Sequence, residues 1–134
     1  MQPGHGRLEK FRKMRLVEVL KLNEDDAVRF FAKETSHEEI VRDLMKSRND
    51  ALNQIEDALR DKGSDHKDIE KLSDQILDID QKIFAERRRY QDEMRKFLAP
   101  EQFGRFLVFE RNFGRQVRNA MTEMREEPRG RRRY

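Results

Sequence analysis

The sequence has 134 residues, of which 43% are charged and 35% hydrophobic, and it carries a formal net charge of +3. This length suits one domain rather than two, and because no stretch approaches about 18 uncharged apolar residues, no transmembrane segment is expected. Six glycines, three prolines and the absence of cysteine and tryptophan exclude disulfides and disfavour the many turns of a β-sandwich or barrel, so the chain is predicted to be all-α.

The chain opens with a short leader, residues 1–6, that we expect to be disordered. It lacks the apolar stretch of a signal peptide, and this absence, taken literally, predicts a cytosolic protein. If a signal peptide ahead of Met1 has been removed, the prediction is instead an exported protein. A short helix is predicted next, over about 7–21, and it ends at Leu22-Asn23-Glu24-Asp25-Asp26. Asn23 suits the N-cap of the following helix, and the acids after it favour the positive end of that helix dipole. The apolar residues of this short helix that are available for burial are Leu8, Phe11, Leu16, Val19 and Leu20.

Two long helices are predicted over 24–62 and 66–98. Each keeps the alternating three- and four-residue apolar spacing of a coiled-coil seam, the row of side chains that faces a partner helix. Polar residues interrupt both seams: Arg48 in the first, and Glu86 and Arg87 in the second.

The connection between these two helices is short. Gly63 suits a helix C-terminus, and Ser64 or Asp65 can cap the next helix. We therefore expect the two helices to fold back on each other as an elongated antiparallel hairpin. A capping-box pattern at Ser36-His37-Glu38-Glu39 leaves open a kink in the first arm near 35–36.

The last predicted helix begins at Leu98-Ala99-Pro100-Glu101-Gln102, with Pro100 at the first helical position, where its missing N–H costs nothing. It is expected to fray near Pro128. Residues 7–125 would then form a single helical domain, and 126–134 a disordered basic tail. The apolar and aromatic residues of this helix are Phe103, Phe106, Phe109, Phe113, Val117 and Met121.

Charge and aromatic residues are segregated along the chain. Residues 34–80 carry 7 basic and 14 acidic side chains, whereas the segments on either side are net positive. All nine phenylalanines lie outside 32–83, so the basic end of the predicted hairpin is also its aromatic end. A two-helix rod cannot enclose so many rings, and a homodimer that buries them is expected. Most of the rings should be core, with Phe103 and Phe109 the exposed ones.

Two short sequences about 76 residues apart, Leu22-Asn23-Glu24-Asp25-Asp26 and Leu98-Ala99-Pro100-Glu101-Gln102, resemble the twin L-T-x-x-Q motifs of the Spy/CpxP family. The Phe-rich segment that follows the second motif and the charged hairpin between the motifs are also similar, so the resemblance spans roughly 8–125. That family contains periplasmic ATP-independent chaperones, envelope-stress inhibitors and metal-resistance sensors. The resemblance implies an α-hairpin with shorter flanking helices, assembled into a cradle-like homodimer in the periplasm. The motif residues that it identifies are Leu22, Asn23, Asp26, Leu98 and Gln102.

Three motif positions depart from the family pattern. Asn23 replaces the first Thr and keeps its capping chemistry, and Asp26, which replaces the first Gln, can reach back toward the cap amide. Ala99 replaces the second Thr and cannot cap a helix, a loss of about 1 kcal/mol that Pro100 partly offsets by fixing its backbone dihedral.

The sequence does not predict an enzyme, because it contains no phosphate-binding loop, no G-x-S-x-G and no H-E-x-x-H. No metal site and no cofactor are expected, since His5, His37 and His66 have no histidine partner three or four residues away; His37 is expected to be solvated. Nucleic acid is not expected as a partner. The basic run Arg87–Arg89 has acidic neighbours and no recognition motif accompanies it, although the arginine tail could attract phosphates or an anionic membrane.

The function that this combination predicts is ATP-independent capture of unfolded or partly folded proteins on a basic and aromatic surface, in a periplasmic protein whose leader has been removed. Charge would attract a client at long range and weak apolar burial would hold it. An alternative is a regulatory or sensory module that binds the periplasmic domain of a sensor kinase or an anti-sigma factor; a plain coiled-coil spacer is the third. The candidate client-binding residues are Arg87, Arg88, Arg89, Phe103, Arg105, Phe109, Arg111, Arg115 and Arg118.

Overall fold

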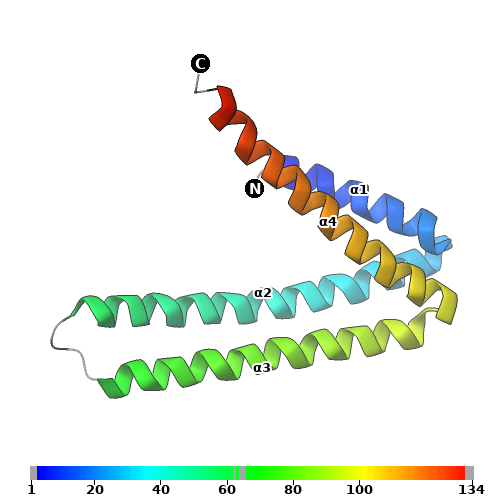
Figure 1. Ribbon diagram of the computed structural model, residues 1–134. Helices are drawn as coiled ribbons and strands as arrows, with labels where there is room; N and C mark the ends of the chain where they lie inside the picture. Colours follow the sequence, from blue (N-terminus) through cyan, green and yellow to red (C-terminus); the bar gives the residue numbers. More distant parts are fainter. Residues whose placement is uncertain (1–2, 62, 64–65, 132–134) are drawn as a thin grey trace. The chain divides into compact units, whose positions relative to one another are not determined.

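The computed structural model describes residues 3–61, 63 and 66–131, with side chains described over 6–61, 63 and 66–125. Four helices account for nearly all of these residues: α1 (Pro3–Leu20), α2 (Glu24–Arg60), α3 (His66–Phe97) and α4 (Pro100–Arg131) (Figure 1). The described ranges contain no β-strand, which confirms the all-α prediction. Within them, no helix has both the length and the apolar content needed to cross a membrane.

The helix boundaries differ from the prediction mainly at the chain ends. Residues 3–6 and 126–131, expected to be disordered, are helical; residues 1–2 and 132–134 of those segments lie outside the described residues, as do the capping candidates Ser64 and Asp65. Proline at the start of a helix loses no bond, so Pro3 can open α1. α4 continues past Pro128, where fraying was expected, and with 32 residues it is as long as α3 rather than shorter.

The kink that was left open near 35–36 is absent, because α2 runs without interruption through these residues. The seam explains this continuity. Glu34, His37 and Val41 keep the three- and four-residue spacing on either side of Ser36. A break would have moved one half of the seam away from its partner helix.

The chain divides into two compact units where a single domain was predicted. We call residues 1–27 with 98–134 the terminal unit, which holds α1 and α4, and residues Val28–Phe97 the central unit, which holds most of α2 and all of α3. Each unit has its own buried residues, and each is described by itself below.

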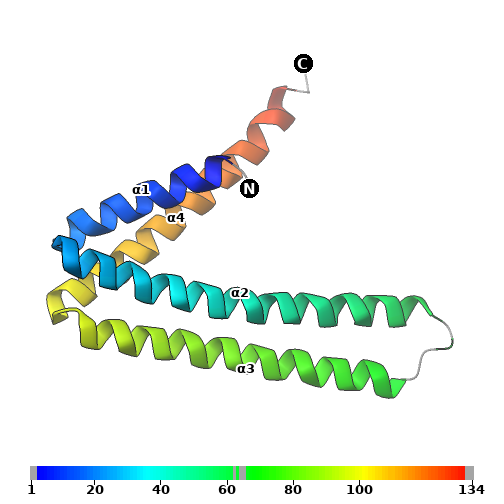
Figure 2. The same cartoon turned by 180° about the vertical axis from the view of Figure 1, so that it is seen from behind.

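In the central unit, α2 and α3 are joined by the ion pairs Lys33–Glu93 at 3.1 Å and Arg48–Asp80 at 2.7 Å, and by a hydrogen bond between His37 and Glu86 at 2.6 Å. Residue numbers rise along α2 as they fall along α3, so the two helices run antiparallel, and both views show them side by side (Figure 2). The buried residues of this unit are Phe30, Glu34, Ala51, Ile76, Ile83, Glu86, Tyr90 and Met94. The four apolar ones on α3 belong to its predicted seam, whereas on α2 the predicted seam residues Leu52 and Leu59 are 40% and 69% exposed.

In the terminal unit, α1 packs on α4. Leu16 and Leu20 of α1 are almost completely buried, as are Leu98 and Phe106. Arg12 of α1 pairs with Glu110 of α4, and Gln102 donates a hydrogen bond to the carbonyl of Leu20. These two links also run in opposite directions, so α1 and α4 are antiparallel.

The end of α1 is a left-handed cap. Lys21 has a φ of 53°, the conformation that usually requires glycine. Its amide bonds the carbonyl of Glu18 at 3.3 Å, and the amide of Leu22 bonds the carbonyl of Val17 at 3.2 Å. This is the Schellman arrangement, which satisfies carbonyls that the helix end would leave free.

Candidate functional site

The terminal unit contains a groove of about 760 Å³ between α1 and α4. We call it the α1–α4 groove. It collects side chains from one stripe of α1 and from successive turns of α4, and both apolar and charged groups line it. The lining residues are Phe11, Arg15, Val19, Pro100, Glu101, Gly104, Arg105, Val108, Phe109, Asn112, Phe113 and Gln116.

Aromatic rings form the floor of this groove. Phe109 and Phe113 are stacked, with ring centroids 5.7 Å apart and planes inclined by 14°. Phe11 contributes a third ring from α1, and 54% of its surface is exposed; Val108 is 50% exposed. Two helices cannot enclose side chains on their outer faces, so apolar surface remains open to a ligand.

Arginines surround the aromatic floor. Arg15 pairs with Glu18 and Arg105 with Glu101, each at 2.7 Å and largely exposed. Arg7 lies one turn before Phe11 on the same stripe of α1, and among the described side chains neither Arg7 nor Arg115 has an acidic partner. Across the whole terminal unit, 15 basic residues stand against 10 acidic ones. The electrostatic character of the groove is therefore cationic.

The residues of the twin motif do not line the groove but set the ends of its helices. The side-chain oxygen of Asn23 accepts a hydrogen bond from the amide of Asp26 at 2.8 Å, as an N-cap should. The side-chain oxygen of Gln102 accepts a hydrogen bond from the amide of Ala99 at 3.0 Å, and its side-chain nitrogen donates a hydrogen bond to the carbonyl of Leu20 at 2.8 Å. Gln102 thus offsets the missing cap at Ala99 and links the start of α4 to the end of α1. Leu22 and Leu98 are buried, in keeping with an architectural role.

Of the predicted client-binding residues in the terminal unit, only Arg105 and Phe109 line the groove. Phe103 is half-buried and its ring lies 6.4 Å from that of Phe106. The remaining three predicted residues of this unit are exposed on α4: Arg111, which hydrogen-bonds Asn112, Arg115 and Arg118.

The expectation that Phe103 and Phe109 are the exposed rings is wrong, because both are half-buried. The exposed rings are Phe11, at 54%, and Phe84, at 76%. Phe109 is covered in part by its stacking partner Phe113, a contact between residues one turn apart on α4.

The other predicted basic cluster, Arg87, Arg88 and Arg89, belongs to the central unit. Arg88 pairs with Asp92 at 3.4 Å, whereas Arg89 bridges Glu86 and Glu93 at 2.6 Å each. Arg89 is therefore neutralised by two acids. Arg87 is exposed and is the better candidate of the three for meeting an anionic partner.

The correction with the largest structural consequence concerns His37, which was expected to be solvated. Its side chain is only 15% exposed, and its Nδ1 lies 2.6 Å from Glu86. Glu86, which interrupts the seam of α3, is buried in turn. The hydrogen bond from Arg89, with a smaller contribution from His37, holds the pKa of the Glu86 carboxyl below its ordinary value. These groups satisfy one another and face a packed helix pair, which fits a structural role better than a catalytic one.

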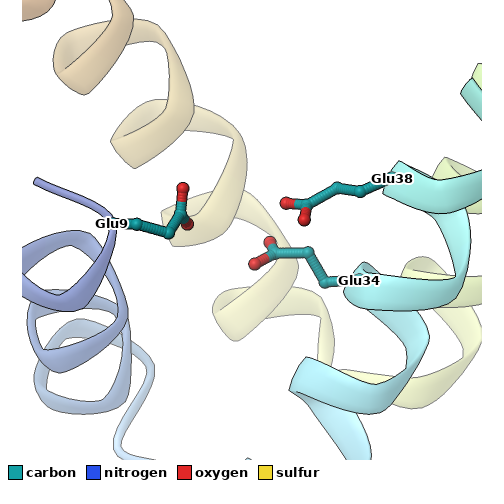
Figure 3. Close-up of side chains that lie close together, drawn as sticks. All are labelled: Glu9, Glu34 and Glu38. Atoms are coloured by element: carbon teal, nitrogen blue, oxygen red, sulfur yellow. The ribbon is translucent and has the colours of Figure 1, made fainter. Parts of the chain in front are cut away.

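Figure 3 draws three carboxylates, two of which lie on successive turns of α2. Glu34 is buried and accepts a hydrogen bond from the hydroxyl of Tyr90 at 3.3 Å, while Glu38 is exposed. The third, Glu9, belongs to the terminal unit, so no joint site is argued. Two carboxylates alone fall short of the three or four ligands that a zinc site requires.

Apart from Arg105 and Phe109, the sequence analysis assigned no groove residue to the site, and it missed the contribution of α1 altogether. Phe11 and Val19 were expected in the core, and Arg7 and Arg15 were not considered. A usable signal was present: residues 7, 11, 15 and 19 recur every four positions, on a face different from that of the buried Leu16 and Leu20. A mixed arginine and apolar stripe of this kind marks an open face.

No protein-family model, curated protein or solved structure matches this chain.

Proposed function

We propose that this protein is an ATP-independent, chaperone-like binding protein that holds unfolded or partly folded segments of other proteins in the α1–α4 groove. The observation that carries the proposal is the row of accessible rings, Phe11, Phe109 and Phe113, within a cationic unit. Neither an enzymatic activity nor a bound cofactor or metal is part of the proposal. The twin motif and the order of the helices support membership of the Spy/CpxP family, and with it a periplasmic location.

The groove suits weak and reversible capture. Covering about 100 Å² of apolar surface contributes roughly 2.5 kcal/mol, so a few half-exposed rings give an affinity that needs no energy input for release. Arginines on the rim raise the encounter rate with acidic segments, and salt weakens that attraction. The combination favours holding a client briefly over burying it permanently.

The test is suppression of aggregation of a heat-unfolded reporter enzyme by the purified protein. We expect protection at low ionic strength and loss of most of it near about 0.5 M salt, where charges more than a few ångströms apart are screened. Phe109→Ala should weaken protection. Met124→Ala is the control, because Met124 is an exposed apolar residue of the same helix that lies outside the groove. Absence of protection at every ionic strength would overturn the proposal.

We further propose that the protein works as a homodimer, in which the α2–α3 hairpin forms the interface. On α2, the exposed apolar residues Met45, Leu52 and Leu59 recur every seven positions, as do Leu77 and Phe84 on α3. Each follows a seam position by one residue, and in an antiparallel pair such positions lie on the same face. A second copy would cover this face.

Charge on α3 supports a two-fold arrangement. Residues 66–80 carry two basic and five acidic side chains, and residues 81–97 carry six basic and three acidic ones. A two-fold axis across the middle of the face would place each acidic half over the basic half of the other copy. Sedimentation velocity should give a dimer for the wild type and a monomer for Leu77→Glu with Phe84→Glu; a monomeric wild type would contradict this arrangement.

A further inference from the structure

We propose that the ligand of the α1–α4 groove is an acidic amphipathic α-helix of about three turns, which lies between α1 and α4 as a third helix. This inference rests on the proposed function and names the class of segment that the groove selects. Its apolar stripe would cover Phe11, Phe109 and Phe113, and its carboxylates would meet the arginines of the rim.

The spacing of the lining residues favours a helix over an extended strand. On α1 they are Phe11, Arg15 and Val19, four residues apart; on α4 they recur on every turn from Pro100 to Gln116. At about 1.5 Å per residue, these ridges extend over roughly 12 and 24 Å, about two and four turns of a helix, and a ligand helix of about three turns lies between these lengths. Helical walls offer no free backbone groups to an extended strand, whereas a docked helix satisfies its own backbone.

The exposure of side chains on the groove side also favours a third helix as the ligand. The inner face of α1 is fully covered, with Leu16 at 0% exposure, whereas Phe11 and Val108 on the groove side remain half exposed. Two antiparallel helices present such a groove to a third, whose side chains fill it by ridge-into-groove packing. The stacked Phe109 and Phe113 already form one rigid wall, so little ordering is needed on binding.

Charge selects an acidic helix over a basic one. The two acids near the rim, Glu18 and Glu101, are already paired with Arg15 and Arg105. Arg7 and Arg115 have no acidic partner among the described side chains. The antiparallel register set by Arg12–Glu110 brings the positions of Arg7 and Arg115 to the same end of α1 and α4. A basic helix would add like charges there, while an acidic one would neutralise them.

The test uses two labelled peptides of about 14 residues with the same leucine stripe at the i, i+3, i+4, i+7 positions of a helix. One carries glutamate at the remaining positions and the other lysine. Fluorescence anisotropy at low salt should show the glutamate peptide binding at least about tenfold more tightly, a difference of about 1.4 kcal/mol. It should also gain helical circular dichroism when it binds. Equal or tighter binding of the lysine peptide, or binding without helix formation, would overturn the inference.

Variants locate the site. Phe11→Ser and Phe109→Ala should each weaken binding of the glutamate peptide at least about fivefold, and Met124→Ala, at an exposed apolar residue of α4 outside both the groove and the proposed dimer face, should leave it unchanged. Phe11 is more than half exposed, so its replacement keeps the test valid if Phe109→Ala unfolds the unit. Arg115→Glu should reverse the preference toward the lysine peptide. An equal loss in Met124→Ala would place binding elsewhere and contradict the groove.

The outcomes separate this inference from the proposed function. If the protein suppresses aggregation but neither peptide binds, the chaperone-like function stands and the acidic-helix ligand is wrong. If the glutamate peptide binds without any suppression, the groove is a site for one defined partner and the chaperone-like function fails. If Phe11→Ser converts a dimer to a monomer, the groove belongs to a second copy, and the inference is overturned.

Discussion

The ring of His37 on α2 lies flat against the ring of Tyr90 on α3, with centroids 4.0 Å apart and planes inclined by 5°. Both side chains continue into hydrogen bonds across the helix pair. His37 lies 2.6 Å from Glu86, and the Tyr90 hydroxyl donates to Glu34 at 3.3 Å. Among the described side chains, no buried nitrogen or oxygen lacks a partner. Polar residues can therefore occupy the seam without the cost of unsatisfied groups.

Glu86→Gln tests the contribution of this cluster to stability. Because the folded-state pKa of Glu86 lies below its ordinary value, the unfolded chain binds more protons in the acid range. The stabilisation is thus present above about pH 4.3 and is lost as the pH falls through the folded-state value. At pH 7 we expect the variant to lose about 1–3 kcal/mol of unfolding free energy, and the difference from wild type to shrink below about pH 4.

Urea unfolding followed by circular dichroism at several pH values measures this effect. Asp78→Asn is the control, since Asp78 forms only an exposed pair with Lys82 at 3.7 Å on the same helix. It should change the unfolding free energy by less than about 0.5 kcal/mol. If Glu86→Gln lowers the unfolding free energy by the same amount at neutral and at acid pH, the charge of the Glu86 carboxylate does not contribute to stability.

Arg12 and Arg15 provide a matched pair on α1. Arg12 is 12% exposed and reaches Glu110 on α4, whereas Arg15 is 48% exposed and pairs only with Glu18 on its own helix. Arg12→Ala should lower the unfolding free energy by about 1–3 kcal/mol, because it removes the largely buried Arg12–Glu110 link between α1 and α4. Arg15→Ala should cost less than about 0.5 kcal/mol. Thermal unfolding of the two variants checks the ranking, and similar losses would contradict it.

Gln102→Ala removes two hydrogen bonds at the start of α4. Because the side chain bonds both the amide of Ala99 and the carbonyl of Leu20, we expect a loss of about 1–2 kcal/mol. Gln116→Ala, a substitution at an exposed position in the middle of the same helix, should be close to neutral. Restoring a cap with Ala99→Thr in the Gln102→Ala background should recover about 1 kcal/mol. Failure of that rescue would mean that the link to Leu20 is the dominant contribution.

Lys21→Gly should stabilise the protein, which is unusual for a glycine substitution. At a φ of 53°, a side chain costs about 1–2 kcal/mol that glycine avoids, and the added freedom of the unfolded chain takes back part of the gain. The expected net change is a gain of about 0.5–1 kcal/mol. Lys10→Gly in the middle of α1 should instead destabilise by about 1 kcal/mol. The denaturant midpoint should rise for Lys21→Gly and fall for Lys10→Gly. A fall for both variants would contradict the left-handed conformation of Lys21.

Much of the fold was predictable because it depends on local spacing. The three- and four-residue rhythm placed α2 and α3 within two residues of their observed ends, and Pro100 marked the first residue of α4. Asn23 was predicted as an N-cap and its side chain accepts the amide of Asp26. Each of these features is decided by residues within one or two turns of each other, so a single sequence contains the information.

The candidate site was predictable only in part. Arg105 and Phe109, two of the predicted client-binding residues, line the groove, whereas Phe11 was expected in the core and is exposed, and Phe103 was expected at the surface and is half-buried. Both errors concern which face of a helix a neighbour covers. The period of a helix shows that residues share a face, but it does not show which neighbouring helix packs against that face.

By itself, the sequence determined that this protein is a set of charged helices with two long seams, capped starts and a cationic, aromatic terminal region. Only the tertiary structure decided that Arg48 meets Asp80, that His37 meets Glu86, and that Phe11 and Phe109 face one groove. The reason is physical. Helix formation and capping depend on backbone bonds between near neighbours in the chain, whereas these contacts join residues about 30 to 100 positions apart and exist only once helices have packed.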